Sequence, residues 1–180
     1  MSVRVRLIGV LLVLLLASAC ATRPLAHQLQ PEDSAKLRSL HLYYEFFNSL
    51  VTQKSERAFV YLDKNIFYLE NVSKTFACMN KTQVSPMLSQ RFATASLKEH
   101  EAALALNKSE PSVFSSYEIK NTEENLPDYV QKIRKELTED DIVLWVELAP
   151  GEAATLNFSR AMLILKDYDK GLAIRGLMLE

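Results

Sequence analysis

The chain has 180 residues, of which 48% are hydrophobic, and its 21 Lys and Arg nearly balance its 22 Asp and Glu. This balance argues against a nucleic-acid partner, because phosphate binding needs clustered cations. The chain has only four Gly, none of them clustered, which excludes a glycine-rich phosphate-binding loop.

Residues 1–19 have the pattern of an export signal. Arg4 and Arg6 precede an unbroken apolar run from Leu7 to Ala17, and small residues follow it. This run is shorter than the roughly 20 residues that a bilayer-spanning helix needs. We therefore expect a signal peptide rather than a membrane span.

The next residues, Ala17-Ser18-Ala19-Cys20, resemble the lipobox of bacterial lipoproteins, although Ala17 stands where the commonest pattern has Leu. The resemblance implies that Cys20 becomes the first residue of the mature chain and carries acyl chains such as palmitate, which anchor the protein in a membrane. Because Ala21 rather than Asp follows Cys20, the resemblance also implies sorting to the outer membrane, with the domain facing the periplasm.

The same small residues also fit ordinary secretory cleavage, which would leave Cys20 as a plain thiol in a secreted or periplasmic soluble protein. The chain has two cysteines, and in an exported protein Cys20 could then form a disulfide with Cys78. If Cys20 is acylated instead, we expect Cys78 to be buried and inert.

The segment after the cysteine, Ala21 to Asp33, contains two prolines and few large apolar residues. We interpret residues 20–33 as the lipidated cysteine and a flexible tether. Residues 34–180 then form a single globular domain, which is long enough to fold without a disulfide or a metal ion.

Two helices are predicted at the start of this domain. Residues Pro31–Ser34 supply the start signals of the first helix. Its apolar residues recur at steps of three and four, and further aromatic residues widen the stripe: Leu37, Leu40, Tyr44, Phe47 and Val51, with Tyr43, Phe46 and Leu50 beside them. A short second helix is predicted from Ser55, its N-cap, to Asn65, with Phe59 and Leu62 facing inward.

The middle of the domain is less regular. Ile66 to Met79 is either a hairpin with a turn near Asn71–Ser73 or an irregular segment. Ser85-Pro86 has the signature of a helix start, and we expect a long helix from there to Leu106. Its apolar face would carry Leu88, Phe92, Ala95 and Leu97.

The rest of the chain is predicted to be mostly strands. The expected elements, in order, are a strand at Ser112–Lys120, a short helix at Pro127–Leu137, a strand at Ile142–Leu148, a turn at Pro150-Gly151-Glu152, and a closing hairpin of Ala161–Lys166 and Leu172–Leu179. In the Ile142–Leu148 strand, one face would carry Ile142, Leu144, Val146 and Leu148, and the other Val143 and Trp145. The hairpin loop Asp167–Gly171 would place Gly171 in the left-handed position of a bulge.

This order predicts an α+β fold, with N-terminal helices packed on one face of a curved antiparallel sheet. The first helix, with Leu40, Tyr43, Tyr44 and Phe47, and the closing hairpin around residues 163–177 resemble the NTF2-like (SnoaL-like) fold, a cystatin-like cone. This resemblance implies a cavity between the first helix and the sheet. Tyr44, Tyr117 and Trp145 would then be its wall residues, unless they simply pack in the core.

No residue pattern in the sequence specifies a reaction. The three histidines, His27, His41 and His100, have no metal-ligand spacing with a cysteine or carboxylate. We therefore predict no catalytic residues, no metal ion and no cofactor. The expected role is that of a lipid-anchored envelope lipoprotein, a non-enzymatic binding or assembly module with an envelope protein as its partner. The alternative is a small-ligand carrier or enzyme that uses the NTF2-like cavity.

Overall fold

The structure is a computed structural model, and it describes residues 31–70, 76–121, 133–169 and 171–180. The predicted signal peptide, Cys20 and His27 lie outside the described residues, as do most of the predicted tether, the turn near Asn71–Ser73 and the first part of the helix predicted at Pro127–Leu137. Within the described part of the chain, no helix is long and apolar enough to cross a bilayer. Residues Ala35–Glu180 form one compact unit.

A six-stranded sheet in the order β2-β1-β6-β5-β4-β3 forms the centre of this unit. Its strands are β1 (Leu62–Glu70), β2 (Phe76–Asn80), β3 (Ser112–Ser115), β4 (Asp141–Glu147), β5 (Arg160–Tyr168) and β6 (Gly171–Leu179). Neighbouring strands are antiparallel except β1 and β6, which are parallel. The sheet is therefore mixed rather than purely antiparallel, because the last strand returns beside the first with no short turn to set its direction.

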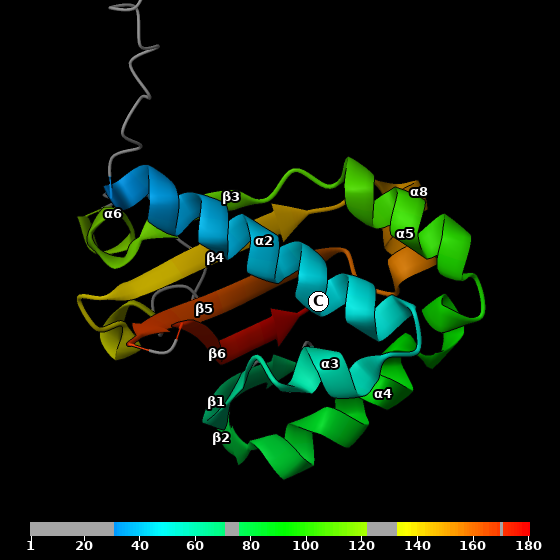
Figure 1. The fold of residues 1–180 in the computed structure, drawn as a ribbon, viewed down its shortest axis with the longest axis horizontal. Helices are drawn as coiled ribbons and strands as arrows, with labels where there is room; N and C mark the ends of the chain where they lie inside the picture. Colours follow the sequence, from blue (N-terminus) through cyan, green and yellow to red (C-terminus); the bar gives the residue numbers. More distant parts are fainter. Residues whose placement is uncertain (1–30, 71–75, 122–132, 170) are drawn as a thin grey trace, which may run out of the picture. The chain divides into compact units, whose positions relative to one another are not determined.

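Helices cover one face of the curved sheet, which confirms the predicted α+β class (Figure 1). They are α2 (Pro31–Val51), α3 (Ser55–Phe59), α4 (Lys81–Ser96), α5 (Glu99–Lys108) and α8 (Pro150–Leu156). On the opposite face, α6 (Ser116–Asn121) and the helical residues 133–136 pack over a smaller apolar cluster. We call the first set of buried residues the helix-side core and the second the far-side cluster.

The first helix is confirmed, but its buried face differs from the predicted stripe. Leu37 is exposed and Tyr44 is only partly buried, whereas Tyr43, Phe46 and Leu50 are fully buried. The helix carries apolar residues over an arc wider than one stripe, so that spacing alone did not determine its rotation. Packing on the sheet turns the side with the larger aromatic residues inward.

The second helix is much shorter than predicted. It ends at Phe59, and the chain continues as β1 from Leu62. Ser55 is not the N-cap, because Lys54 occupies that position without a side-chain cap. The apolar residues of this segment suit either a helix or a strand, and hydrogen bonding to β2 and β6 selects the strand. The hairpin alternative for residues 66–79 is confirmed by the antiparallel pairing of β1 with β2.

The long helix predicted from Ser85 consists of two helices. The first, α4, begins at Lys81, where Asn80 Oδ1 accepts the Gln83 N–H at 3.0 Å and Gln83 Oε1 accepts the Asn80 N–H at 3.0 Å. This reciprocal cap outweighs the Ser-Pro signal and leaves Pro86 inside the helix. The chain turns after Ser96, and Leu97, predicted to face inward, is 80% exposed.

Two further predictions in the second half of the chain are wrong in part. The strand from Ser112 stops at Ser115, where α6 begins. The predicted turn at Pro150-Gly151-Glu152 is instead the start of α8, because proline at the first helical position and an acid in the first turn both favour a helix. The strand at 142–148 and the closing hairpin are confirmed, and Gly171 has a φ of 120°.

Candidate functional site

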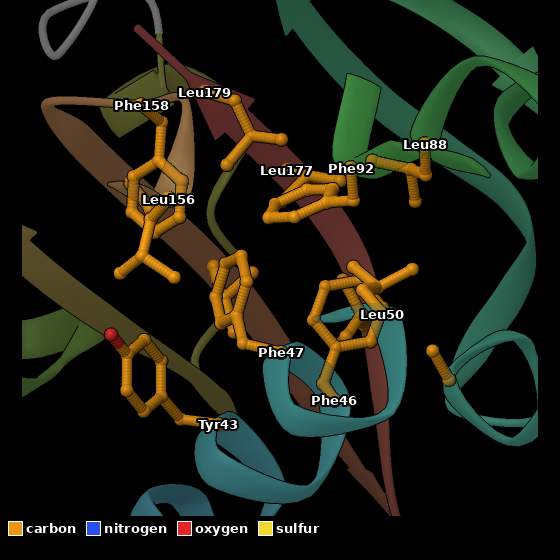
Figure 2. Packing of buried hydrophobic residues seen from close by; sticks show 14 of the residues in the cluster. Tyr43, Phe46, Phe47, Leu50, Leu88, Phe92, Leu156, Phe158, Leu177 and Leu179 are labelled. Carbon is orange, nitrogen blue, oxygen red and sulfur yellow. The ribbon is translucent and has the colours of Figure 1, made fainter. Parts of the chain in front are cut away.

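The space between α2 and the sheet, where the NTF2-like resemblance implied a cavity, is filled by aromatic side chains (Figure 2). The Phe47 ring lies 5.0 Å from Tyr43, 5.1 Å from Phe158 and 5.9 Å from Phe92, centroid to centroid. All four side chains are essentially buried. Interlocked rings at these distances form one packed aromatic group at that place.

The structure does not bring the three predicted wall residues together. Tyr44 packs against the helix-side core, and Trp145 packs against the far-side cluster on the other face of the sheet. Tyr117, on α6, is 74% exposed. The alternation along β4 explains the position of Trp145, because Val143 and Trp145 point away from Leu144 and Val146, as the sequence predicted.

A buried hydroxyl network joins α2 to the end of α5. The Ser109 hydroxyl donates to Leu106 O at 2.6 Å, which leaves its oxygen to accept from Tyr43 Oη at 2.9 Å. Tyr44 Oη donates to Ser109 O at 2.9 Å. Burial raises the pKa of Tyr43 well above its usual value, and the hydrogen bond with Ser109 offsets part of this rise. Tyr43 is therefore a neutral structural group rather than an acid or base near neutral pH.

Tyr43→Phe is expected to lower the free energy of unfolding at pH 7 by about 1 kcal/mol, because the ring still fits and only one hydrogen bond is lost. The raised pKa means that wild-type stability is fully present below the unfolded tyrosine pKa of about 10 and is lost as pH rises above it. The stability difference should therefore shrink above that pH. Urea unfolding of Tyr43→Phe and of the exposed control Tyr117→Phe tests this, and equal losses in both variants would contradict the assignment.

An open hollow of about 370 Å³ lies on the helix-covered side of the domain. Three segments line it: Arg38 and Leu42 on α2, Val60 and Tyr61 before β1, and Gly171 and Leu172 at the start of β6. Its lining mixes polar and apolar surface, with Arg38 beside Leu42, Tyr61 and Leu172, and Val60 is 69% exposed. A solvent-open hollow with one exposed aliphatic residue and a charged rim can receive a partner's side chain.

An ion pair between α2 and the β5–β6 hairpin borders this hollow. Arg38 Nη2 lies 2.6 Å from Asp167 Oδ2, and Arg38 Nη1 lies 3.4 Å from Asp167 Oδ1. Both side chains are partly exposed, so the pair adds little to stability. Its planar, two-point geometry instead fixes the position of the guanidinium group at the rim.

The far side of the sheet holds a second polar group, between β4 and β6. Arg175 Nη1 lies 3.4 Å from Asp141 Oδ2, and Arg175 Nη2 donates to Glu136 O at 2.7 Å. Asp141 Oδ2 also accepts the Thr138 N–H at 2.6 Å. The Arg175 guanidinium lies 5.4 Å from the centre of the Phe67 ring. These contacts tie residues 136–141 to the sheet, which is a structural role.

The remaining candidate residues are at the surface. Cys78 is exposed on β2, so that the expected burial of this thiol is wrong. Strand alternation on an edge strand turns its side chain away from the helix-side core. His41 and His100 are both exposed. Among the residues that the structure describes, no group of three His, Cys, Asp or Glu side chains could hold a metal ion.

Sequence reasoning missed every residue of the hollow. Arg38 reads as a solvated charge on the polar side of a helix, and Val60 falls in a segment that was assigned to a helix. The hollow forms where three segments that are distant in sequence come into contact. A single sequence does not directly indicate such long-range contacts. The one usable signal was the closing hairpin, whose loop was correctly placed near Gly171.

Comparisons with known proteins do not identify the chain. No protein-family model matches it, and no curated protein does. Solved structures with some likeness include a protein of unknown function from Mycobacterium tuberculosis, with a TM-score of 0.41, 14% identity, and coverage of 85% of this chain and 76% of that chain. At these values the likeness carries no argument about a ligand, a reaction or a partner.

The names of two other similar structures contain the terms NTF2-like and cystatin-like, the same terms as the resemblance noted in the sequence. One is an NTF2-like protein of unknown function from Cytophaga hutchinsonii, with a TM-score of 0.35, 11% identity, and coverage of 87% of this chain and 93% of that chain. The other is a domain of unknown function with a cystatin-like fold from Nostoc punctiforme, with a TM-score of 0.35, 10% identity, and coverage of 83% and 76%.

Proposed function

We propose that this protein is a lipid-anchored, non-enzymatic binding module of the bacterial envelope, which holds a protein partner close to the outer membrane. The anchor is the acylated Cys20, exposed after removal of residues 1–19, and the segment up to Asp33 acts as the tether. Two or more acyl chains on one residue would make the attachment effectively permanent, since a single chain holds a protein only marginally.

The observation that carries this proposal is the filled space between α2 and the sheet. Tyr43, Phe47, Phe92 and Phe158 occupy it as one packed aromatic group (Figure 2). A carrier or enzyme built on this fold would need an enclosed pocket at that place, with a few converging polar groups. Packed rings there support recognition at the surface instead.

The open hollow is the part of the surface that fits this role. Its apolar walls at Leu42, Tyr61 and Leu172 can take up an apolar side chain of a partner, while exposed Val60 adds contact area at its edge. The Arg38–Asp167 pair at the rim can orient the polar groups of the partner. A partner already held near the same membrane would need only modest affinity, because anchoring raises its effective concentration.

The proposal is tested by comparing two variants that place a carboxylate on an exposed aliphatic residue. Val60→Asp puts the charge in the hollow, and Leu97→Asp puts it at the α4–α5 corner, outside the residues that line the hollow. We expect affinity capture from detergent-solubilised envelopes to recover the same partner with the wild type and with Leu97→Asp. The yield with Val60→Asp should be at least about tenfold lower, because a buried unpaired charge costs more than 1.4 kcal/mol.

Urea unfolding of both variants serves as the control for folding, and each should unfold within about 0.5 kcal/mol of the wild type, since both positions are exposed. Recovery of one partner at equal yield from all three proteins would place recognition elsewhere and reject the hollow. Turnover or tight binding of a small molecule by the purified chain would favour the carrier or enzyme alternative.

A further inference from the structure

We draw no further inference here: the strongest candidate, the Asp141–Arg175 side-chain pair on the far side of the sheet, has two buried atoms, Asp141 Oδ1 and Arg175 Nε, without a hydrogen-bond partner among the described residues, but it carries no ligand site because residues 122–132, just before this segment in the chain, are not described and nothing in the structure shows what covers the pair.

Discussion

Phe47→Ala is expected to lower the free energy of unfolding by about 4 kcal/mol, the largest single effect that we predict for a core residue. Phe47 is fully buried on α2 and contacts the rings of Tyr43, Phe46, Phe92 and Phe158. Truncation removes the apolar area of one ring and leaves a cavity that four surrounding rings cannot readily close. Urea unfolding followed by tryptophan fluorescence measures the loss, since Trp145 is the only tryptophan of the chain.

Two matched variants make the result interpretable. Phe47→Leu keeps most of the side-chain volume, and its free energy of unfolding should fall by less than about 2 kcal/mol. This variant still gives a measurable result if the alanine variant does not fold. Leu37→Ala changes an exposed residue of the same helix and should stay within about 0.5 kcal/mol of the wild type. A loss below about 1 kcal/mol for Phe47→Ala would show that the aromatic group is not packed as described.

Arg175→Met is expected to lower the free energy of unfolding by about 3 kcal/mol, because it leaves the Asp141 carboxylate buried without its ionic partner. The Asp141 side chain is fully buried, and the Arg175 side chain is 15% exposed. Methionine keeps much of the side chain's apolar packing. The same substitution removes the hydrogen bond to Glu136 O and the contact with the Phe67 ring.

A double-mutant cycle separates the ion pair from the other contacts of Arg175. Arg175→Met combined with Asp141→Asn should recover about 1 kcal/mol or more relative to Arg175→Met alone, because no unpaired charge is then buried. The matched control is Arg38→Met, which breaks an exposed pair and should cost at most about 1 kcal/mol. Strict additivity of the two substitutions would show that Asp141 and Arg175 do not interact.

The sequence predicted the elements whose signals are local and repeated. The two faces of β4 were assigned correctly, because five consecutive apolar residues, Ile142–Val146, alternate between two layers of packing. The closing hairpin was found because a loop with Gly171 at its end separates two apolar runs. In both cases, chain-local chemistry and tertiary packing favour the same structure.

The errors occur where two local signals compete or where contacts between distant segments decide. Asn80 and Ser85 both have the chemistry of a helix start, and the reciprocal cap with Gln83 selects Asn80. Residues 60–65 could be a helix or a strand, and pairing with β6, far along the chain, selects the strand. The parallel β1–β6 pair and the hollow depend on such distant contacts, so that no local pattern reveals them.

Mass spectrometry of the mature N-terminus tests the proposed lipid anchor at residue 20 directly. The chain, produced in a bacterial host with its own leader and purified from the membrane fraction, should begin at Cys20 and carry acyl chains there. Cys20→Ser should abolish both the acylation and the cleavage before residue 20. A mature protein in which Cys20 is an unmodified thiol, or is joined to Cys78 by a disulfide, would contradict the account.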